Sequence, residues 1–228
     1  MKDQLREFWH RGRLAAARQL RFTVPGRFQP YRHTLPDRYP WLFGFARDAL
    51  GHIAQPRLLS FGCSIGDELE SLRGAFPTAL IRGVDISPVA IARCRARFGS
   101  DDRISLAVAA DTRNEGDGDY DAVFCLAVLC HGDLTRLGAP RSDSLFSFQS
   151  FERAVADLAR CVRRGGFLFL HAANYRFGDT STAAQFETVL HAQGDQIATG
   201  LLYDRENRLI VNGRYSPAGF RKGTARQI

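Results

Sequence analysis

The sequence of 228 residues lacks an apolar run long enough to cross a membrane, which takes about 20 consecutive residues. The N-terminus also lacks the apolar core of a secretion signal. Asp3 and Glu7 interrupt its arginine-rich start, which disfavours a mitochondrial transit peptide. We therefore expect a cytoplasmic protein with no membrane partner.

Cysteine is scarce, and no two cysteines form a CxxC pair. The five cysteines are Cys63, Cys94, Cys125, Cys130 and Cys161. They are odd in number and stand in apolar or helix-face contexts, so buried free thiols are favoured over disulfides or zinc ligands. This usage suits a reducing compartment, and no metal site is predicted.

The net charge of +7 lies almost wholly in the first 50 residues, which hold ten Lys and Arg against four Asp and Glu. Residues 1–22 are predicted to form a basic helix. Residues 23–40 interleave prolines, arginines and aromatics, a pattern typical of an extended linker or lid. We expect two parts, a basic helix and lid over 1–40 and the main domain over 41–228. The basic part could bind nucleic acid, or it could close over the cofactor and a small anionic or aromatic substrate.

From residue 57 onwards, short apolar segments alternate with helical ones. Strands are predicted at 57–61, 80–84, 104–108, 121–128 and 166–172. Helices are predicted at 41–51, from Asp67 onwards, at 88–98 behind a Ser87 cap, and from 150 to a stop at Gly165-Gly166. This alternation predicts an α/β fold with a parallel sheet covered on both faces.

The pattern changes after residue 171. A helix is predicted near 182–194, followed by two apolar runs within 196–211 and a last strand near 215–222. We expect the runs and the last strand to be antiparallel and to complete one edge of the sheet.

The stretch "LLSFGCSIGDELESL", residues 58–72, breaks from a strand into a glycine turn and then a helix. Gly62 and Gly66 permit a tight turn and close approach of the backbone to a ligand. The free N–H groups of the helix start would suit a phosphate, but Asp67 and Glu68 in the first turn would repel one. These acids favour a ligand that carries a cationic amine or a sulfonium.

Acidic residues also stand at the ends of the next two strands. Asp85 follows Gly66 by about 20 residues, the spacing of an acid that accepts from ribose hydroxyls. Ile86 offers an apolar face to a purine. Asp111 could accept from an adenine amine or be a solvated loop acid. The fourth strand carries the chain towards His131 at the same edge of the sheet.

In this order and spacing, the pieces resemble class I S-adenosylmethionine-dependent methyltransferases over about residues 41–222. The resemblance implies a Rossmann-like seven-stranded sheet, mostly parallel with an antiparallel C-terminal edge and helices on both faces, and S-adenosyl-L-methionine as cofactor. It assigns the cofactor to Gly62, Cys63, Ser64, Gly66, Glu68, Asp85, Ile86, Ala110, Asp111, Cys125 and Leu126. Ser60 and Ser64 depart from the family's usual acid and glycine, although a "GCSxGxE" loop resembles that of chemotaxis-receptor glutamate methyltransferases.

The acceptor side is less specific. His131 is the candidate general base, because its pKa is ordinarily near neutrality, and its alternative is a packing role. Further substrate candidates are His33, Tyr39, His171, Asn174 and Tyr175. No [DN]PP[YF] motif and no Pro-Cys nucleophile follows the fourth strand, so a small-molecule acceptor is favoured over nucleic acid. Methylation of a protein side chain and a non-catalytic cofactor-binding role are further alternatives.

The glycine turn also bears on a dehydrogenase alternative. It fits GxGxG rather than the GxGxxG of nicotinamide enzymes, and no P-loop lysine follows it. A methyltransferase is therefore favoured over a dehydrogenase.

Overall fold

A computed structural model describes residues 28–29 and 37–224. The predicted helix over 1–22, most of the predicted lid and the candidate His33 lie outside the described residues. The division of the chain at residue 40 therefore stays a prediction, although the first described helix begins at Pro40.

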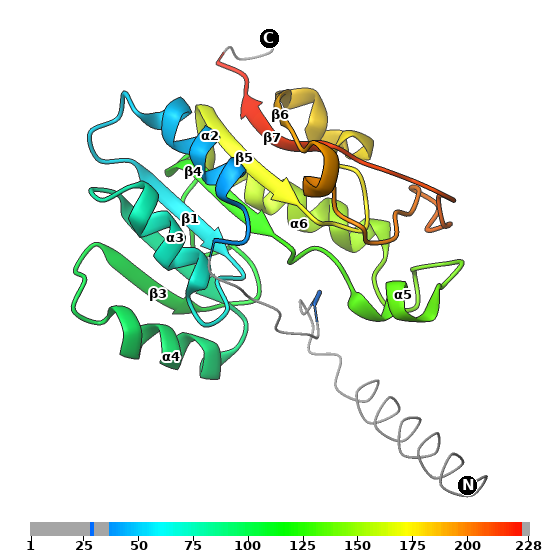
Figure 1. Cartoon of the computed structure of the whole chain (residues 1–228), viewed down its shortest axis with the longest axis horizontal. Coiled ribbons are helices and arrows are strands. Elements are labelled where there is room, and N and C mark those ends of the chain that lie inside the picture. Colours follow the sequence, from blue (N-terminus) through cyan, green and yellow to red (C-terminus); the bar gives the residue numbers. More distant parts are fainter. Residues whose placement is uncertain (1–27, 30–36, 225–228) are drawn as a thin grey trace, which may run out of the picture.

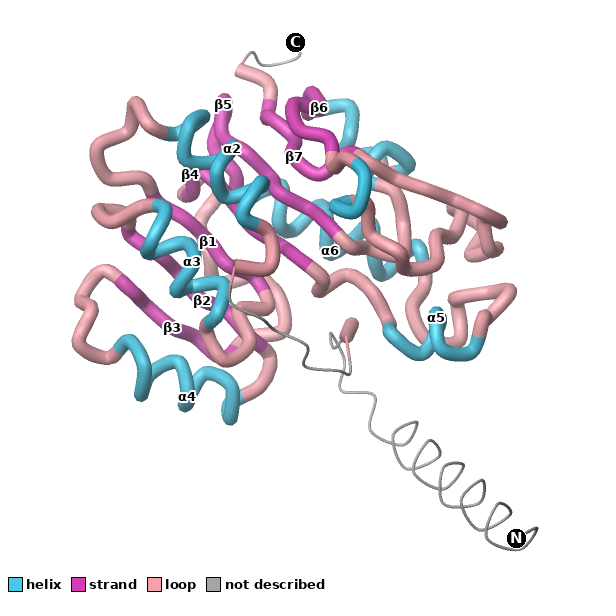
Figure 2. Tube along the Cα trace, in the orientation of Figure 1, coloured by secondary structure: helices cyan, strands magenta, loops and turns pink. Residues whose placement is uncertain are grey.

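The core of the described chain is a seven-stranded sheet in the order β3-β2-β1-β4-β5-β7-β6 (Figures 1 and 2). The strands are β1 (Arg57–Phe61), β2 (Leu80–Asp85), β3 (Ile104–Val108), β4 (Tyr120–Leu126), β5 (Val162–His171), β6 (Phe186–His191) and β7 (Pro217–Lys222). Strands β1 to β5 pair in parallel, and β7 is antiparallel to both β5 and β6. The predicted sheet, mostly parallel with an antiparallel C-terminal edge, is confirmed.

Helices cover both faces of the sheet. They are α2 (Pro40–Leu50), α3 (Asp67–Ala75), α4 (Pro88–Phe98), α5 (Gly132–Leu137) and α6 (Phe148–Cys161), with short 3-10 turns η1 (Phe177–Asp179), η2 (Ser181–Gln185) and η3 (Gly194–Gln196). Alternating side chains of β1 show the two-sided burial: Leu58 packs with α2, α3 and α4, whereas Leu59 packs with α6. The helix predicted at 88–98 is confirmed with its cap, because the Ser87 hydroxyl accepts from the Ala90 N–H at 3.3 Å.

The prediction that α6 runs to Gly165-Gly166 is wrong. The helix ends at Cys161, and Val162 already pairs with Tyr120 of β4. The register then jumps, so that Ala122 pairs with Phe167. Gly165, at φ +72°, lies in this irregular stretch, so the glycines shape the start of β5 instead of ending a helix.

The predicted helix near 182–194 is also wrong. Residues 181–185 form the turn η2, and residues 186–191 form β6, which pairs with β7 at the sheet edge. Phe186 packs edge-on against Phe177 at 5.5 Å, and tertiary pairing of this kind overrides local helix propensity. Residues 196–211 do not form the strands predicted there; within them the chain makes only isolated bridges such as Tyr203–Leu209.

Candidate functional site

The candidate site lies beyond the carboxyl ends of the parallel strands, where β1 stands between β2 and β4. The strand order reverses at this point, which is where open α/β sheets bind ligands. The turn after β1 holds three left-handed residues, Gly62 at φ +79°, Ser64 at +51° and Gly66 at +100°. A Cβ at Gly62 would lie 2.4 Å from Val128, and one at Gly66 would lie 2.5 Å from Phe98. Both positions therefore require glycine.

Ser64 occupies a backbone conformation that favours glycine, and its surroundings explain how serine is held there. Its N–H donates to Asp85 Oδ2 at 2.9 Å. Its hydroxyl oxygen is buried and has no hydrogen-bond partner among the described residues. An orphaned buried hydroxyl costs free energy unless a ligand or water pairs with it, so this atom marks a place for a polar ligand.

Asp85 ties two turns of the site together. One carboxylate oxygen accepts from the Ser64 N–H, and the other accepts from the Ser87 N–H at 2.7 Å. Each carboxylate oxygen has two acceptor positions, so both keep capacity for a further donor. The half-buried Ile86 stands between these residues.

Ser60 acts as the partner of an acid on the neighbouring helix. Its side chain is fully buried, and its hydroxyl donates to Glu68 Oε1 at 2.6 Å. Burial raises the pKa of Glu68 to about 7, and the hydrogen bond from Ser60 opposes that rise. The family usually carries an acid at the position of Ser60 on β1. Here Ser60 instead donates a hydrogen bond to an acid on the following helix, Glu68 of α3.

The two acids of the α3 start have different environments. Asp67 forms an ion pair with Arg97 at 2.7 Å, and Arg97 also pairs with Glu70. Glu68 has no cationic partner among the described residues. The sequence argument for a cationic ligand therefore applies to Glu68, since the charge of Asp67 is already balanced.

Asp111 and Ala110 lie at the end of β3 and line a cavity of about 390 Å³ with Phe61. Arg113 donates to the Asp111 carboxylate through its backbone N–H at 3.1 Å and through its guanidinium Nε at 2.9 Å. These contacts lower the pKa of Asp111, with the side-chain hydrogen bond as the largest cause. The carboxylate is therefore ionised at neutral pH.

The end of β4 turns sharply into the acceptor side. Cys125 is fully buried, and burial raises the pKa of its thiol, so it is not a nucleophile. Cys63, at the turn after β1, is also buried. After Leu126 the chain reverses at Ala127, which has φ +57° and donates to the His171 carbonyl at 2.9 Å.

A second cavity, of about 760 Å³, lies beside this turn. We call it the acceptor-side cavity. Its walls come from the residues before α2, the start of α5, the end of β5 and the segment 195–200. Tyr39, His131, His171 and Asn174, all predicted from the sequence, line it together.

A hydrogen bond fixes the backbone of His131, and the residue lines the acceptor-side cavity. Its N–H donates to Asn174 Oδ1 at 2.6 Å, and Asn174 in turn donates to the Leu201 carbonyl at 2.8 Å. The ring Nδ1 is buried without a hydrogen-bond partner among the described residues. Burial lowers the pKa of His131, and nearby Asp133 opposes that change, so the ring is neutral at pH 7.

His171 forms an aromatic wall with two residues from the start of α2. Its ring lies edge-on to Tyr39 at 5.1 Å and to Trp41 at 5.5 Å. Burial and the nearby Arg38 lower the pKa of His171 to about 4, against a hydrogen bond to the Gln196 backbone. Burial also raises the pKa of Tyr39 to about 12. All three rings are uncharged at neutral pH.

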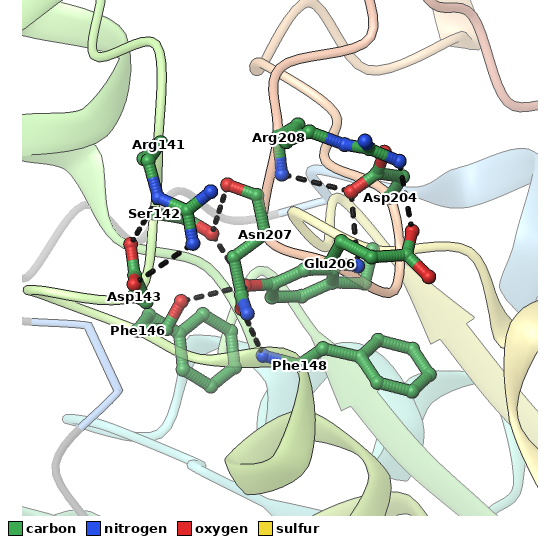
Figure 3. Close-up of polar contacts among 10 residues, drawn as sticks. Arg141, Ser142, Asp143, Phe146, Phe148, Asp204, Glu206, Asn207 and Arg208 are labelled. Carbon is green, nitrogen blue, oxygen red and sulfur yellow. Dashed lines mark hydrogen bonds and ion pairs between the residues drawn. The ribbon is translucent and has the colours of Figure 1, made fainter.

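The structure places Tyr175 outside the acceptor-side cavity. Its buried hydroxyl contacts the Ser142 hydroxyl and shares its single proton between the Phe146 carbonyl oxygen at 2.7 Å and Asn207 Oδ1 at 2.9 Å. Figure 3 shows how Asn207 reaches from the turn at 204–207 towards Phe148, whose N–H donates to the same oxygen at 2.7 Å. Tyr175 is thus a support of the loops behind the cavity.

Several residues at the site gave no signal in the sequence. Trp41 follows Pro40, and the sequence marks it as a helix start and as one of the aromatics of the basic segment, with no sign of a place beside His171. The Ser60–Glu68 hydrogen bond is formed between two separate elements, a strand and a helix. Asn207 stands in a polar stretch that looks like any other turn. Only the "S…E" spacing across the glycine turn could have suggested one of these contacts.

Comparisons with known proteins place the fold. A family model described as "Methyltransferase domain" matches residues 59–168. N-methyltransferase NodS from Bradyrhizobium japonicum WM9 aligns with a TM-score of 0.51 and 16% identity, over 82% of this chain and 99% of that chain. Magnesium protoporphyrin IX methyltransferase ChlM from Synechocystis PCC 6803, with bound SAM, aligns with a TM-score of 0.53 and 14% identity, over 81% of this chain and 77% of that one.

A putative sarcosine dimethylglycine methyltransferase from Galdieria sulphuraria also aligns, with a TM-score of 0.38 and 17% identity. The alignment covers 57% of this chain and 45% of that one, so the chain spans less than half of that protein. No match is found among curated protein sequences.

No helix in the described part of the chain is long and apolar enough to pass through a bilayer. The strand order, the glycine turn, the orphaned Ser64 hydroxyl and the unbalanced Glu68 carboxylate fit an adenosyl sulfonium ligand. Together with the matched domain, they identify the chain as a class I S-adenosylmethionine-dependent methyltransferase.

Proposed function

We propose that the protein transfers a methyl group to an oxygen or nitrogen atom of a small molecule bound in the acceptor-side cavity, with His131 as general base. The observation that carries this proposal is the position of the neutral His131 ring on the wall of a cavity of about 760 Å³. A neutral imidazole can accept the acceptor's proton as the new bond forms.

We assign the cofactor to the turn after β1 and to the ends of β2, β3 and β4. S-Adenosylmethionine supplies an electrophilic methyl group on a sulfonium centre. Glu68 would face its cationic end, Asp85 its ribose and Asp111 its adenine amine; Ser64 would give the turn a free hydroxyl. The remaining assigned residues are Gly62, Cys63, Gly66, Ile86, Ala110, Cys125 and Leu126, which would shape the cradle.

Methyl transfer by in-line displacement depends mainly on alignment. Asn174 fixes the backbone of His131 at the mouth of the turn that follows β4. The aromatic wall of Tyr39, Trp41 and His171 limits access of water to the same space. We also retain Tyr39, His171 and Asn174 as substrate-side residues.

We propose that residues 23–40, the proline- and aromatic-rich part of the 1–40 segment, act as a lid. Two described residues of this segment support the idea. Gln29 donates to Cys130 Sγ at 3.1 Å and accepts from the Gly132 N–H at 3.4 Å, and Phe28 packs against Phe146 at 5.3 Å. The segment therefore reaches the loop that carries His131.

The test uses purified full-length protein, methyl-labelled S-adenosylmethionine and three fractions of a cell extract: small molecules, RNA and protein. We expect label in the small-molecule fraction. His131→Ala should lower that rate by about 10²- to 10⁴-fold while affinity for S-adenosylhomocysteine is unchanged. His191→Ala is the matched control, because His191 is exposed on β6. Label only in RNA or protein contradicts the acceptor class, and an unchanged rate in His131→Ala contradicts its role as base.

A further inference from the structure

The interior of the acceptor-side cavity is uncharged. Its two charged lining residues, Arg38 and Asp195, are exposed and stand at its rim. The buried or half-buried lining residues are Gln29, Tyr39, Trp41, Ala127, Cys130, His131, Gly132, His171, Ala172, Ala173, Asn174, Gln196, Ile197 and Ala198. None of these carries a formal charge at neutral pH, since the His131 and His171 rings stay neutral and the Cys130 pKa is raised to about 11.

An uncharged interior discriminates between acceptor classes. Burying a carboxylate or an alkylammonium without an opposite charge is strongly unfavourable. The charged residues of the described lining are Arg38 and Asp195 at the rim, and Arg38 lies close enough to the interior to act on the pKa values of His171 and Cys130. Glu68, the unbalanced acid nearby, lies outside this lining and is held by Ser60. The absence of a charged group among the buried and half-buried lining residues therefore favours an acceptor whose reacting end is neutral.

The shape of the interior favours a flat ring. The His171 ring stands at 83° to Tyr39 and at 86° to Trp41, so the wall presents aromatic edges and faces at different angles. Aromatic ligands gain from offset and edge-to-face contacts beyond the area that they bury. An aliphatic molecule of equal size would gain only the free energy of burying its surface area.

The basicity of His131 limits which acceptor groups it can deprotonate. Because burial makes His131 a weaker base than ordinary histidine, it suits an acceptor whose proton is already fairly acidic. A phenolic hydroxyl has a pKa of about 10, as tyrosine does, whereas an aliphatic alcohol lies far above that value.

We propose that the acceptor is an uncharged hydroxylated aromatic small molecule, whose ring packs against Tyr39, Trp41 and His171 and whose hydroxyl donates to His131. The acceptor oxygen forms a bond to the methyl carbon as the sulfur–methyl bond breaks. The sulfur keeps that electron pair, and the phenolic proton passes to the imidazole. This inference rests on the proposed function, because it specifies the acceptor for the same cavity.

The first experiment measures binding by calorimetry, with the full-length protein saturated with S-adenosylhomocysteine. Four matched probes are compared: 2-naphthol, its saturated counterpart decahydro-2-naphthol, 2-naphthoate and 2-naphthylmethylamine. We expect 2-naphthol to bind at least about 10-fold more tightly than each of the other three. Equal or tighter binding of the carboxylate, the amine or the saturated alcohol overturns the inference.

A pair of variants locates the ring. Trp41→Leu removes one aromatic ring from the cavity and should weaken 2-naphthol binding about 3- to 10-fold. Phe45→Leu removes an aromatic ring from the same helix, where Phe45 packs against Phe167 and Phe169 away from the cavity. It should leave 2-naphthol binding unchanged. Affinity for S-adenosylhomocysteine, measured in both variants, reports whether each still folds. Equal effects of the two variants on 2-naphthol overturn the inference.

Product analysis separates this inference from the proposed function. We expect methyl-labelled 2-methoxynaphthalene from 2-naphthol. If the small-molecule fraction is labelled only in non-aromatic compounds, the phenol class is wrong and the proposed function stands. If label enters RNA or protein alone, both are wrong.

Discussion

The cofactor side and the acceptor side of this methyltransferase are built by different means. The turn after β1 is defined by its backbone, through three left-handed residues in a short span of sequence and through the hydrogen bonds of Gly62 and Cys63 to Val84 of the neighbouring strand β2. The acceptor-side cavity is assembled from four separated segments, and side-chain contacts hold its loops together. The comparison teaches that one half depends on local conformation and the other on long-range contacts. Each prediction below tests one side of that contrast.

The largest effect is expected at Gly66. Gly66→Ala places a Cβ 2.5 Å from Phe98 in a backbone with φ +100°, which we expect to lower the free energy of unfolding by about 2–4 kcal/mol. Binding of S-adenosylhomocysteine should weaken more than about 100-fold. Gly74→Ala, in the same helix with open space around it, should stabilise by roughly 0.5–1 kcal/mol. Thermal unfolding and calorimetry measure both, and similar results for the two variants would refute a backbone-defined turn.

The second effect concerns the charge that the turn presents. Glu68→Gln should weaken binding of S-adenosylmethionine by about 10- to 100-fold at pH 8, the loss of one contact to a charged group. Glu70→Gln is the control, because Glu70 is exposed and pairs with Arg97. If Glu70→Gln weakens binding as much as Glu68→Gln, the loss reflects only the net charge of the region, and the proposed contact of Glu68 with the cofactor is wrong.

Glu68 also predicts a pH dependence. Its pKa is raised from 4.5 to about 7 in the free protein, so the folded state binds more protons than the unfolded state between these values. The free energy of unfolding should therefore fall by about 3 kcal/mol as pH rises through this window. Glu68→Gln should remove that fall. Affinity of the wild-type protein for the cofactor should rise over the same window, because the carboxylate is the form that attracts a cation.

The third effect tests the long-range contacts of the acceptor side. Asn207→Gly removes the oxygen that accepts from Phe148 N–H and Tyr175 Oη, which should cost about 1–3 kcal/mol. Asn212→Gly is a close control, since Asn207 and Asn212 both have positive φ and Asn212 is exposed. It should change stability by no more than about 0.5 kcal/mol. Chemical denaturation compares them, and equal values would show that Asn207 serves only its turn.

The smallest effect is expected at Ser60. Ser60→Ala removes the donor to Glu68, so the pKa of Glu68 should rise further and cofactor affinity at pH 7 should fall about 3- to 10-fold. Affinity should recover towards pH 9, where the carboxylate ionises without help. Ser71→Ala on the outer part of α3 should show no such pH dependence. A loss in Ser60→Ala that persists at pH 9 would mean that Ser60 shapes the turn and does not tune the acid.

The same contrast explains what the sequence could predict. The sheet, the glycine turn and Asp85 follow from local patterns: strand-helix alternation, residues at positive φ and spacing along the chain. The sequence of β6 predicts a helix, because its partner β7 lies far along the sequence and only that pairing makes it a strand. The hydrogen bonds of Tyr175 were hidden for the same reason. The role of Ser60 depends on its contact with Glu68, and the residue types alone do not predict that contact.

The Asn207 contacts have a consequence for how the chain is made. Synthesis proceeds from the N-terminus, and every residue assigned to the cofactor precedes α5 in the chain. The loops behind the acceptor-side cavity are pinned only when Asn207 reaches Phe148 and Tyr175, after most of the chain has emerged. Synthesis therefore delivers every residue assigned to the cofactor before Asn207, the residue whose contacts join the loops behind the acceptor-side cavity.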